Sequence, residues 1–261
     1  MKYVAFDTET TGLEPGSRLV ELAAIQFDES GVGAAFEELV NPGMPMPEDT
    51  AALNGISAEM LAGARTAKDV LNDFIAWLPP NAVFIAHWAR FDTGILSWET
   101  DRCGITLPSY PVICTCELAK ELRKTPNNKL STLVEHYRIQ RIGNAHRAMS
   151  DADACRQFWE ILLTKEKVTP VARPWNQAGH DYRFPPELPP VLSGIPDLVS
   201  QGSRFSFMYT DAKDETTERS ITPYGWADVK GNIMFHGWCN LRNARRTFRA
   251  DRIQAIEKEA T

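Results

Sequence analysis

Four carboxylic acids in three separated motifs constrain the fold of this chain more than any other feature of its sequence. Carboxylates gathered at one place repel each other, and some take up protons unless divalent cations neutralise them. Oxygen ligands without cysteine favour magnesium or manganese. A fold that joins the motifs would therefore build a metal site. The four acids are Asp7 and Glu9 in residues 6–12 (FDTETTG), Asp92 in residues 87–92 (HWARFD) and Asp151 in residues 146–151 (HRAMSD).

A histidine, His146, stands five residues before the last of these acids. Imidazole ordinarily titrates near neutrality, so a neutral ring can accept a proton from water. Carboxylates, divalent metal and a nearby base are the components of metal-assisted attack of water on a phosphodiester. The sequence therefore favours a metal-dependent nuclease.

The three motifs resemble those of the DnaQ-like exonucleases of the DEDDh subclass, and the resemblance runs from residue 2 to about 165. Residues 54–57 (NGIS) resemble the family's His-Gly-Ile-Thr segment, with Asn54 in place of the histidine. Residues 129–133 (KLSTL) resemble the helix before the last motif. Trp88 departs from the family, which usually has asparagine at that position.

This resemblance implies an α/β fold of the RNase H-like type, a mixed five-stranded sheet flanked by helices, over a domain of residues 1–167. Apolar runs bounded by turn signals agree with it. Capping residues at 66–69 predict a helix start, and further helices are expected over 91–98 and from 147 to about 164. The five expected strands are residues 2–6, 19–27, 35–40, 82–86 and 112–114.

The resemblance also implies a 3′→5′ exonuclease that uses two magnesium ions, with manganese as a substitute, about 3.5–4 Å apart. Asp7 would bridge both ions, Glu9 and Asp151 would complete the water-holding site, and Asp92 would support it. His146 would be the base. The expected substrate is single-stranded or frayed DNA with a free 3′ end, and the expected products are nucleoside 5′-monophosphates. Thr10 and Leu13 would contact the terminal nucleotide, and Trp88 would either stack on a base or fill an apolar gap.

Two alternatives remain open at this point. RNA is a candidate substrate because no feature of the sequence rejects a 2′-hydroxyl. A non-catalytic regulator that grips nucleic-acid ends is the other alternative, although the intact acids and His146 argue against it.

Composition sets broader limits. A hydrophobic fraction of 43% supports a folded core, while a net charge of −6 argues against a protein that coats nucleic acid by bulk electrostatics. Five scattered cysteines form no complete zinc site, so reduced thiols and a cytoplasmic location are expected. Acids interrupt the first apolar run, and no stretch is long enough to span a membrane, so neither a signal peptide nor a membrane partner is expected. No oligomeric state is predicted.

Residues 168–196 are rich in proline and predict a semi-rigid linker, part of which packs on a domain. Beyond it, short strands over 205–209, 218–223 and 232–239 predict a small all-β barrel of the SH3 type. Residues 197–261 resemble the WYL domain in 207–211, in the Arg-x-x-x-Pro element at 219–223 and in the arginine-rich closing motif, although residues 233–235 replace the name-giving tripeptide. Such domains bind nucleic acid or a small ligand. The arginines that would form an anion site, or instead pair with surface acids, are Arg219, Arg242, Arg246, Arg249 and Arg252.

Overall fold

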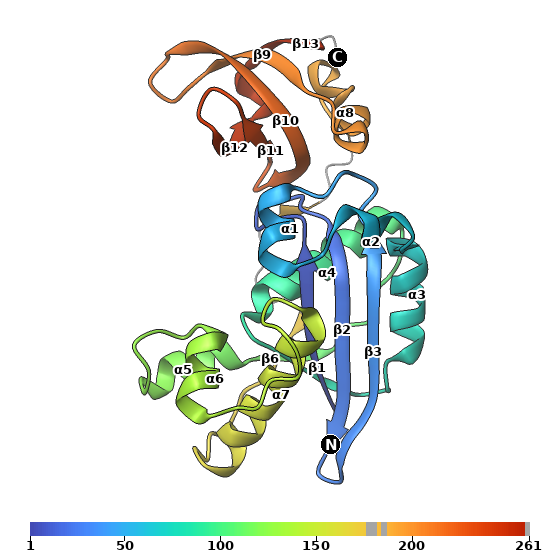
Figure 1. Cartoon of the computed structure of the whole chain (residues 1–261), viewed down its shortest axis with the longest axis vertical. Coiled ribbons are helices and arrows are strands. Elements are labelled where there is room, and N and C mark those ends of the chain that lie inside the picture. The colour runs from blue at the N-terminus through green and yellow to red at the C-terminus, as the bar shows by residue number, and fades with distance from the viewer. Residues whose placement is uncertain (176–181, 184–186, 259–261) are drawn as a thin grey trace. The chain divides into compact units, whose positions relative to one another are not determined.

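The computed structural model describes residues 1–175, 182–183 and 187–258 and divides the chain into two compact units (Figure 1). The first unit comprises residues 1–9, 19–41 and the described residues from 51 to 175. The second comprises residues 10–18 and 42–50 together with the described residues from 182 onward. Two short segments from the first part of the chain therefore belong to the second unit.

A seven-stranded mixed sheet forms the centre of the first unit, with five long strands and a two-residue strand at each edge. The five long strands match the sequence expectation. β5 pairs in parallel with β1 and β6, whereas β2 and β3 pair antiparallel. The order across the sheet is β4 (Arg65–Thr66), β3 (Gly31–Asn41), β2 (Leu19–Asp28), β1 (Tyr3–Thr10), β5 (Val83–Ala86), β6 (Pro111–Cys114) and β7 (Arg173–Pro174).

Helices cover both faces of this sheet. Val4 and Phe6 of β1 point into one apolar core with α3 (Ala67–Trp77) and α4 (Ala89–Cys103). Ala5 points the other way, into a second core with α5 (Thr115–Leu122), α6 (Leu130–Tyr137) and α7 (Ala148–Thr164). Because neighbouring side chains of a strand alternate between faces, one apolar strand serves both cores. Two short helices, α1 (Glu48–Asn54) and α2 (Ala58–Ala62), follow β3.

Trp175 completes the first core from beyond the predicted end of the domain at residue 167. It is 5% exposed, its ring stacks on Phe6 with centroids 5.7 Å apart, and it meets Phe84 edge-on at 5.3 Å. Its indole Nε1 donates to Ser97 Oγ at 3.0 Å. The predicted linker over 168–196 therefore does pack in part, while its residues 176–181 and 184–186 lie outside the described residues.

The second unit contains an antiparallel sheet of six strands. Its three expected strands are present, and β10 is longer than predicted. An SH3-type closure stays a prediction. The order is β12 (Ala244–Arg249), β11 (Asn232–Cys239), β10 (Thr216–Val229), β9 (Phe205–Thr210) and β13 (Ile253–Lys258), with β8 (Tyr182–Arg183) paired to β10, and the adjoining helices are η2 (Pro190–Leu192), α8 (Ile195–Gln201) and η3 (Ala250–Arg252).

Residues 10–18 pack on this sheet through glycine. A Cβ placed on Gly225 of β10 would lie 2.3 Å from the carbonyl oxygen of Gly16, so the two backbones approach too closely for any side chain. Met44, from the other inserted segment, joins Phe205, Phe207 and Phe235 in the core of the unit. Within the described residues, no helix is long and apolar enough to cross a bilayer.

Replacing Trp175 by alanine should lower the free energy of unfolding by about 3–5 kcal/mol, because it removes a buried aromatic ring and leaves a cavity. Trp88→Ala is the matched control, since that ring is 49% exposed and its loss should cost much less. Urea unfolding measures both. Equal effects of the two substitutions would contradict the role given to Trp175.

Candidate active site

The first motif lies at the end of β1, in the middle of the sheet. Phe6, Thr8 and Thr10 are buried, whereas Asp7 and Glu9 alternate with them and are half-buried. Two acids at positions i and i+2 of a strand project from the same face. The strand thus presents both carboxylates together, as the sequence predicted.

Asp92 is held against this strand from α4. Its side chain is buried, and its Oδ1 accepts hydrogen bonds from the backbone N–H of Thr8 at 3.0 Å and from the Thr8 hydroxyl at 2.8 Å. The carboxylate therefore fastens the first turn of α4 to β1. Burial raises the pKa of Asp92 to about 7, and the two bonds from Thr8 oppose that rise.

The third motif meets the first at the start of α7. Asp151 lies in the first turn, and its Oδ2 accepts a hydrogen bond from the backbone N–H of His146 at 3.3 Å. His146 is exposed and adopts a left-handed backbone conformation with φ of 60°. One ligand atom from each of Glu9, His146 and Asp151 lies within 4.8 Å of the others. Residues far apart in the sequence thus meet in a group that could hold a cation.

The four acids and a fifth, Glu21, influence one another. The pKa of Asp7 is well above its ordinary value, first because the surrounding protein shields the carboxyl group from water and then because Asp92, Asp151, Glu9 and Glu21 repel its negative form. Burial, followed by repulsion from Asp151 and Glu21, raises the pKa of Glu9 to about 8. Such crowding favours either protons or a multivalent cation at the site.

Glu21, which the sequence reasoning missed, fixes the start of α7. It lies on β2, is 1% exposed, and forms an ion pair with Arg147. Its Oε2 also accepts the backbone N–H of Ala148, the first residue of α7, at 2.8 Å. A carboxylate at a helix N-terminus satisfies a free amide and complements the helix dipole. The sequence does contain a signal for this residue, because Glu21 is an acid inside an apolar strand, where a charge requires a hydrogen-bond or ion-pair partner.

Arg141 is a second residue that sequence reasoning missed. Its Nη1 forms an ion pair with Asp151 Oδ1 and donates to Ser150 Oγ at 3.2 Å. Both side chains of the ion pair are largely shielded from solvent, with exposures of 16% for Arg141 and 13% for Asp151. The guanidinium therefore offsets part of the negative charge of the cluster. Nothing in the sequence around Arg141 marks it for this position.

Two polar residues near the motifs, His87 and Asn54, contact the elements around the acids. His87 contacts Thr115 Oγ1 at 3.0 Å through Nδ1 and the Asn128 carbonyl oxygen at 2.8 Å through Nε2, so it connects β5 to the following elements. Burial lowers the pKa of His87. Asn54 is buried, and its amide lies near enough to Glu9 to lower that pKa, without a hydrogen bond of good geometry.

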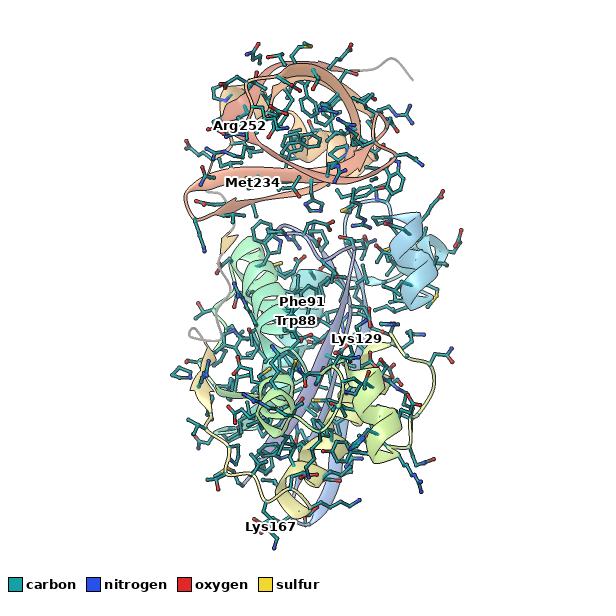
Figure 2. The ribbon with its side chains drawn as sticks, turned by 90° about the vertical axis from the view of Figure 1, so that its left-hand side faces the viewer. Trp88, Phe91, Lys129, Lys167, Met234 and Arg252 are labelled. Atoms are coloured by element: carbon teal, nitrogen blue, oxygen red, sulfur yellow. The ribbon has the colours of Figure 1, made fainter. Side chains whose placement is uncertain are left out.

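The predicted substrate contacts near the motifs differ in exposure. Thr10 is buried, and its hydroxyl donates to the Gly12 carbonyl oxygen at 2.6 Å. Leu13 is 71% exposed. Trp88 is 49% exposed and stacks face to face on Phe91, with centroids 5.3 Å apart and planes 7° apart (Figure 2). Trp88 therefore does not fill a buried gap, and its role in stacking on a base stays a prediction.

The five predicted arginines lie on several elements of the second unit. Arg219 is on β10, Arg246 and Arg249 are on β12, Arg252 is in η3, and Arg242 is in the turn before β12. Arg249 forms an ion pair with Asp251 at 2.7 Å, which agrees with the surface-pairing alternative for that residue. A shared anion site stays a prediction. Arg245 of β12 was not among the predicted residues, yet its guanidinium donates to both carboxylate oxygens of Asp49 and lies over the Tyr224 ring.

Comparison with known proteins agrees with this geometry. The sequence profile of the exonuclease family, described as "Exonuclease" (RNase_T), matches residues 4–157, and the WYL domain profile matches residues 190–258. This chain belongs to the exonuclease family. A WYL domain follows the exonuclease domain.

Curated relatives of the exonuclease domain include DNA polymerase III PolC-type of Lacticaseibacillus paracasei, 36% identical over 155 residues, which are 59% of this chain. The same protein of Oceanobacillus iheyensis is 38% identical over 166 residues, or 61% of this chain. In both, the match covers only 11% of the relative's length. The activity of those whole proteins therefore does not transfer directly.

Solved structures show the same fold. Exonuclease X in complex with 5′ overhanging duplex DNA is 23% identical with a TM-score of 0.52, and the match covers 64% of this chain and 94% of that one. E. coli Exonuclease I in complex with a dT13 oligonucleotide is 14% identical with a TM-score of 0.57, and the match covers 91% of this chain and 55% of that one.

The stability of the protein in a chelator should fall as pH rises from about 5.5 to 8.5. Glu9 and Asp92 have folded-state pKa values of about 8 and about 7, above their ordinary values of 4.5 and 3.8. A raised pKa stabilises the folded state at low pH, and this contribution is lost as pH rises through the folded values. Each kcal/mol lost lowers the melting midpoint by roughly 2–4 °C in a domain of this size.

Magnesium should largely remove this fall, because a bound cation favours the ionised carboxylates. Scanning calorimetry with chelator and with magnesium at both pH values measures the difference. Glu9→Gln should reduce the slope in chelator, since it removes one titrating group. Identical pH slopes with and without magnesium would contradict a cation site at the cluster.

Proposed function

We propose that this protein is a metal-dependent 3′→5′ exonuclease that removes nucleoside 5′-monophosphates from the 3′ end of DNA. The observation that carries the proposal is the meeting of Glu9, His146 and Asp151 within 4.8 Å, beside two further acids on β1 and α4. Proteins that only bind nucleic-acid ends have no need of such a costly concentration of buried negative charge.

Asp7, Glu9, Asp92 and Asp151 are the residues that would hold magnesium. All four supply hard oxygen ligands. The raised pKa values of Asp7, Glu9 and Asp92, which burial and then repulsion between the carboxylates produce, fit a site that binds cations. Bound divalent cations would neutralise the cluster, favour the hydroxide form of water and stabilise charge on the phosphate. Manganese, which has the same ligand preferences, is the expected substitute.

His146 would accept the proton of the attacking water. Its ring nitrogen approaches Glu9 and Asp151, while the side chain as a whole is exposed. This position gives the imidazole access both to the acids and to solvent, into which the proton can pass. Asp151, through its bond from the His146 backbone, orients the turn that carries the base.

DNA is the favoured substrate, because the curated relatives are DNA polymerases and two structural neighbours were solved with DNA. RNA is the alternative, since another structural neighbour is a 3′-exonuclease solved to show 3′-end specific recognition of a histone mRNA stem-loop. Parallel assays on DNA and RNA strands labelled at the 5′ end distinguish the two. A ladder of shortened labelled products establishes removal from the 3′ end.

The substitutions Asp7→Asn and Asp151→Asn should each lower turnover by ~10² or more, because loss of a charged ligand removes several kcal/mol of metal-dependent stabilisation. Asparagine preserves shape, so both variants should stay folded. Asp101→Ala is the control, since Asp101 is an exposed acid at the far end of α4. Gel assays with magnesium measure turnover, and retention of more than about a tenth of it would refute the assignment.

Replacing His146 by alanine should lower turnover by ~10²–10⁴, the usual contribution of a general base, while magnesium binding is largely kept. His136→Ala, another exposed histidine, is the matched control. An unchanged rate in His146→Ala would assign His146 a structural role.

The non-catalytic alternative makes the opposite prediction for the same gels. A protein that only binds ends would protect the labelled strand at every magnesium concentration and would leave no ladder. The WYL domain, in either case, would bind nucleic acid or a small ligand, and the predicted arginines are candidates for that contact.

A further inference from the structure

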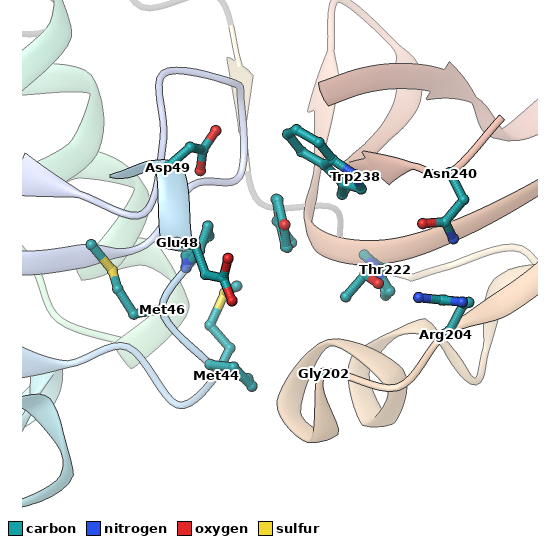
Figure 3. A pocket seen from close by; sticks show the side chains of 13 residues that line it. Met44, Met46, Glu48, Asp49, Gly202, Arg204, Thr222, Trp238 and Asn240 are labelled. Atoms are coloured by element: carbon teal, nitrogen blue, oxygen red, sulfur yellow. The ribbon is translucent and has the colours of Figure 1, made fainter. Parts of the chain in front are cut away.

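The second unit contains an open pocket of about 710 Å³ that the predicted arginines do not line. One side is the C-terminal sheet with residues 202 and 204, and the other is the inserted segment of residues 44–49 (Figure 3). Small-molecule sites in proteins commonly have volumes of roughly 300–1,000 Å³. The pocket is therefore large enough for a nucleotide-sized ligand.

The sheet side of the pocket is an aromatic surface with polar neighbours. Thr222 of β10 lies opposite Trp238 of β11 in the antiparallel register. Tyr224 lies at a β-bulge two residues further along β10, and Asn240 lies in the turn directly after β11. All four line the pocket. Asn240 Nδ2 donates to Ser220 Oγ at 3.0 Å, which orients the amide and leaves its oxygen as an acceptor.

The opposite side is partly apolar and partly acidic. Met44 and Met46 are 8% and 9% exposed and supply polarisable thioethers that adapt to flat ligands. Glu48 and Asp49 are exposed, and Figure 3 shows Glu48 across from the group that contains Arg204. A phosphate would be repelled by Glu48 and attracted toward Arg204.

Arg245 of β12, which lies opposite Trp238 in the antiparallel register, holds two residues that line this pocket. Its Nε and Nη2 donate to the two carboxylate oxygens of Asp49 at 2.7 and 2.6 Å, and its guanidinium lies over the Tyr224 ring at 5.0 Å from the centroid. Asp49 is therefore neutralised in place, and the ring is held by a cation–π contact. The aromatic surface is preorganised, which lowers the entropy lost when a ligand binds.

We propose that this pocket binds a nucleobase by stacking on Trp238 and Tyr224, with the Asn240 oxygen accepting from the base and Arg204 near its phosphate. Flat aromatic surfaces beside a hydrogen-bonding amide suit bases, whereas the acidic side disfavours recognition of a phosphate backbone. The choice of a nucleobase rests on the proposed exonuclease function, which supplies two sources. One is the released mononucleotide, and the other is a base of the bound strand.

The test is equilibrium dialysis of radiolabelled dAMP and of a short oligodeoxyadenylate with the full chain in chelator. An Asp7→Asn background prevents cleavage and metal-mediated binding at the carboxylate cluster. Trp238→Ala should weaken binding on the order of 10- to 100-fold, as expected for loss of a base–aromatic stack. Trp238→Phe should keep most of the affinity, and Leu241→Ala, an exposed neighbour outside the pocket, should bind like the parent.

Dependence on Trp238 with dAMP identifies the free nucleotide as a ligand, and dependence with the oligonucleotide alone identifies a base of the strand. The proposal is overturned if neither probe binds, if Trp238→Ala binds like the parent, or if Arg246→Ala causes the loss instead. None of these results depends on turnover. A failure here is therefore distinct from a failure of the magnesium-dependent gel assay, which tests the proposed function itself.

Discussion

The crowding of carboxylates that are shielded from water is the constraint on which the exonuclease domain depends. The loss of contact with water, followed by repulsion among the acids, raises the pKa values of Asp7, Glu9 and Asp92, and Asp151 and Glu21 contribute to that repulsion. A fold tolerates this only where surrounding contacts fix the groups and provide positive charge. Function here is opposed to stability, since the arrangement that suits a cation destabilises the ionised protein without one.

Three of the five acids, Asp92, Asp151 and Glu21, have hydrogen-bond or ion-pair partners that offset their charge. Thr8 donates twice to Asp92, Arg141 pairs with Asp151, and Arg147 pairs with Glu21. The contacts of Asp92 and Glu21 also connect strands to helices, α4 to β1 and α7 to β2, whereas the contact of Arg141 holds the loop before α7. A hydrogen bond to a charged group contributes more than one between neutral groups. The same contacts therefore position the acids of the site and hold α4 and α7 against the sheet.

The sequence predicted the parts of this fold that have local signals. Apolar runs located the five long strands, and the motifs located the acids and His146, because strand ends and helix starts follow from short-range patterns. Arg141 could not be predicted, since its role arises only when the loop between α6 and α7 folds back so that its guanidinium reaches Asp151, ten residues further along the chain. The role of Glu21 could have been predicted, because an acid in a buried strand requires a hydrogen-bond or ion-pair partner. The role of Arg245 could not be predicted, because nothing in the sequence distinguishes it from the neighbouring arginines. Only the folded chain brings Asp49 and Tyr224 to it.

Arg245 also has a consequence for the order in which the chain can fold. Its Nη1 donates to the carbonyl oxygen of Thr11 at 3.2 Å across 234 residues of sequence. The segments at 10–18 and 42–50 are synthesised before the sheet that belongs to their unit. Contacts between distant residues form slowly because a long loop must close first. During synthesis, the segment that directly follows Glu9 therefore stays without its final partners until the strands from β9 to β13 emerge, after all the long strands of the first unit.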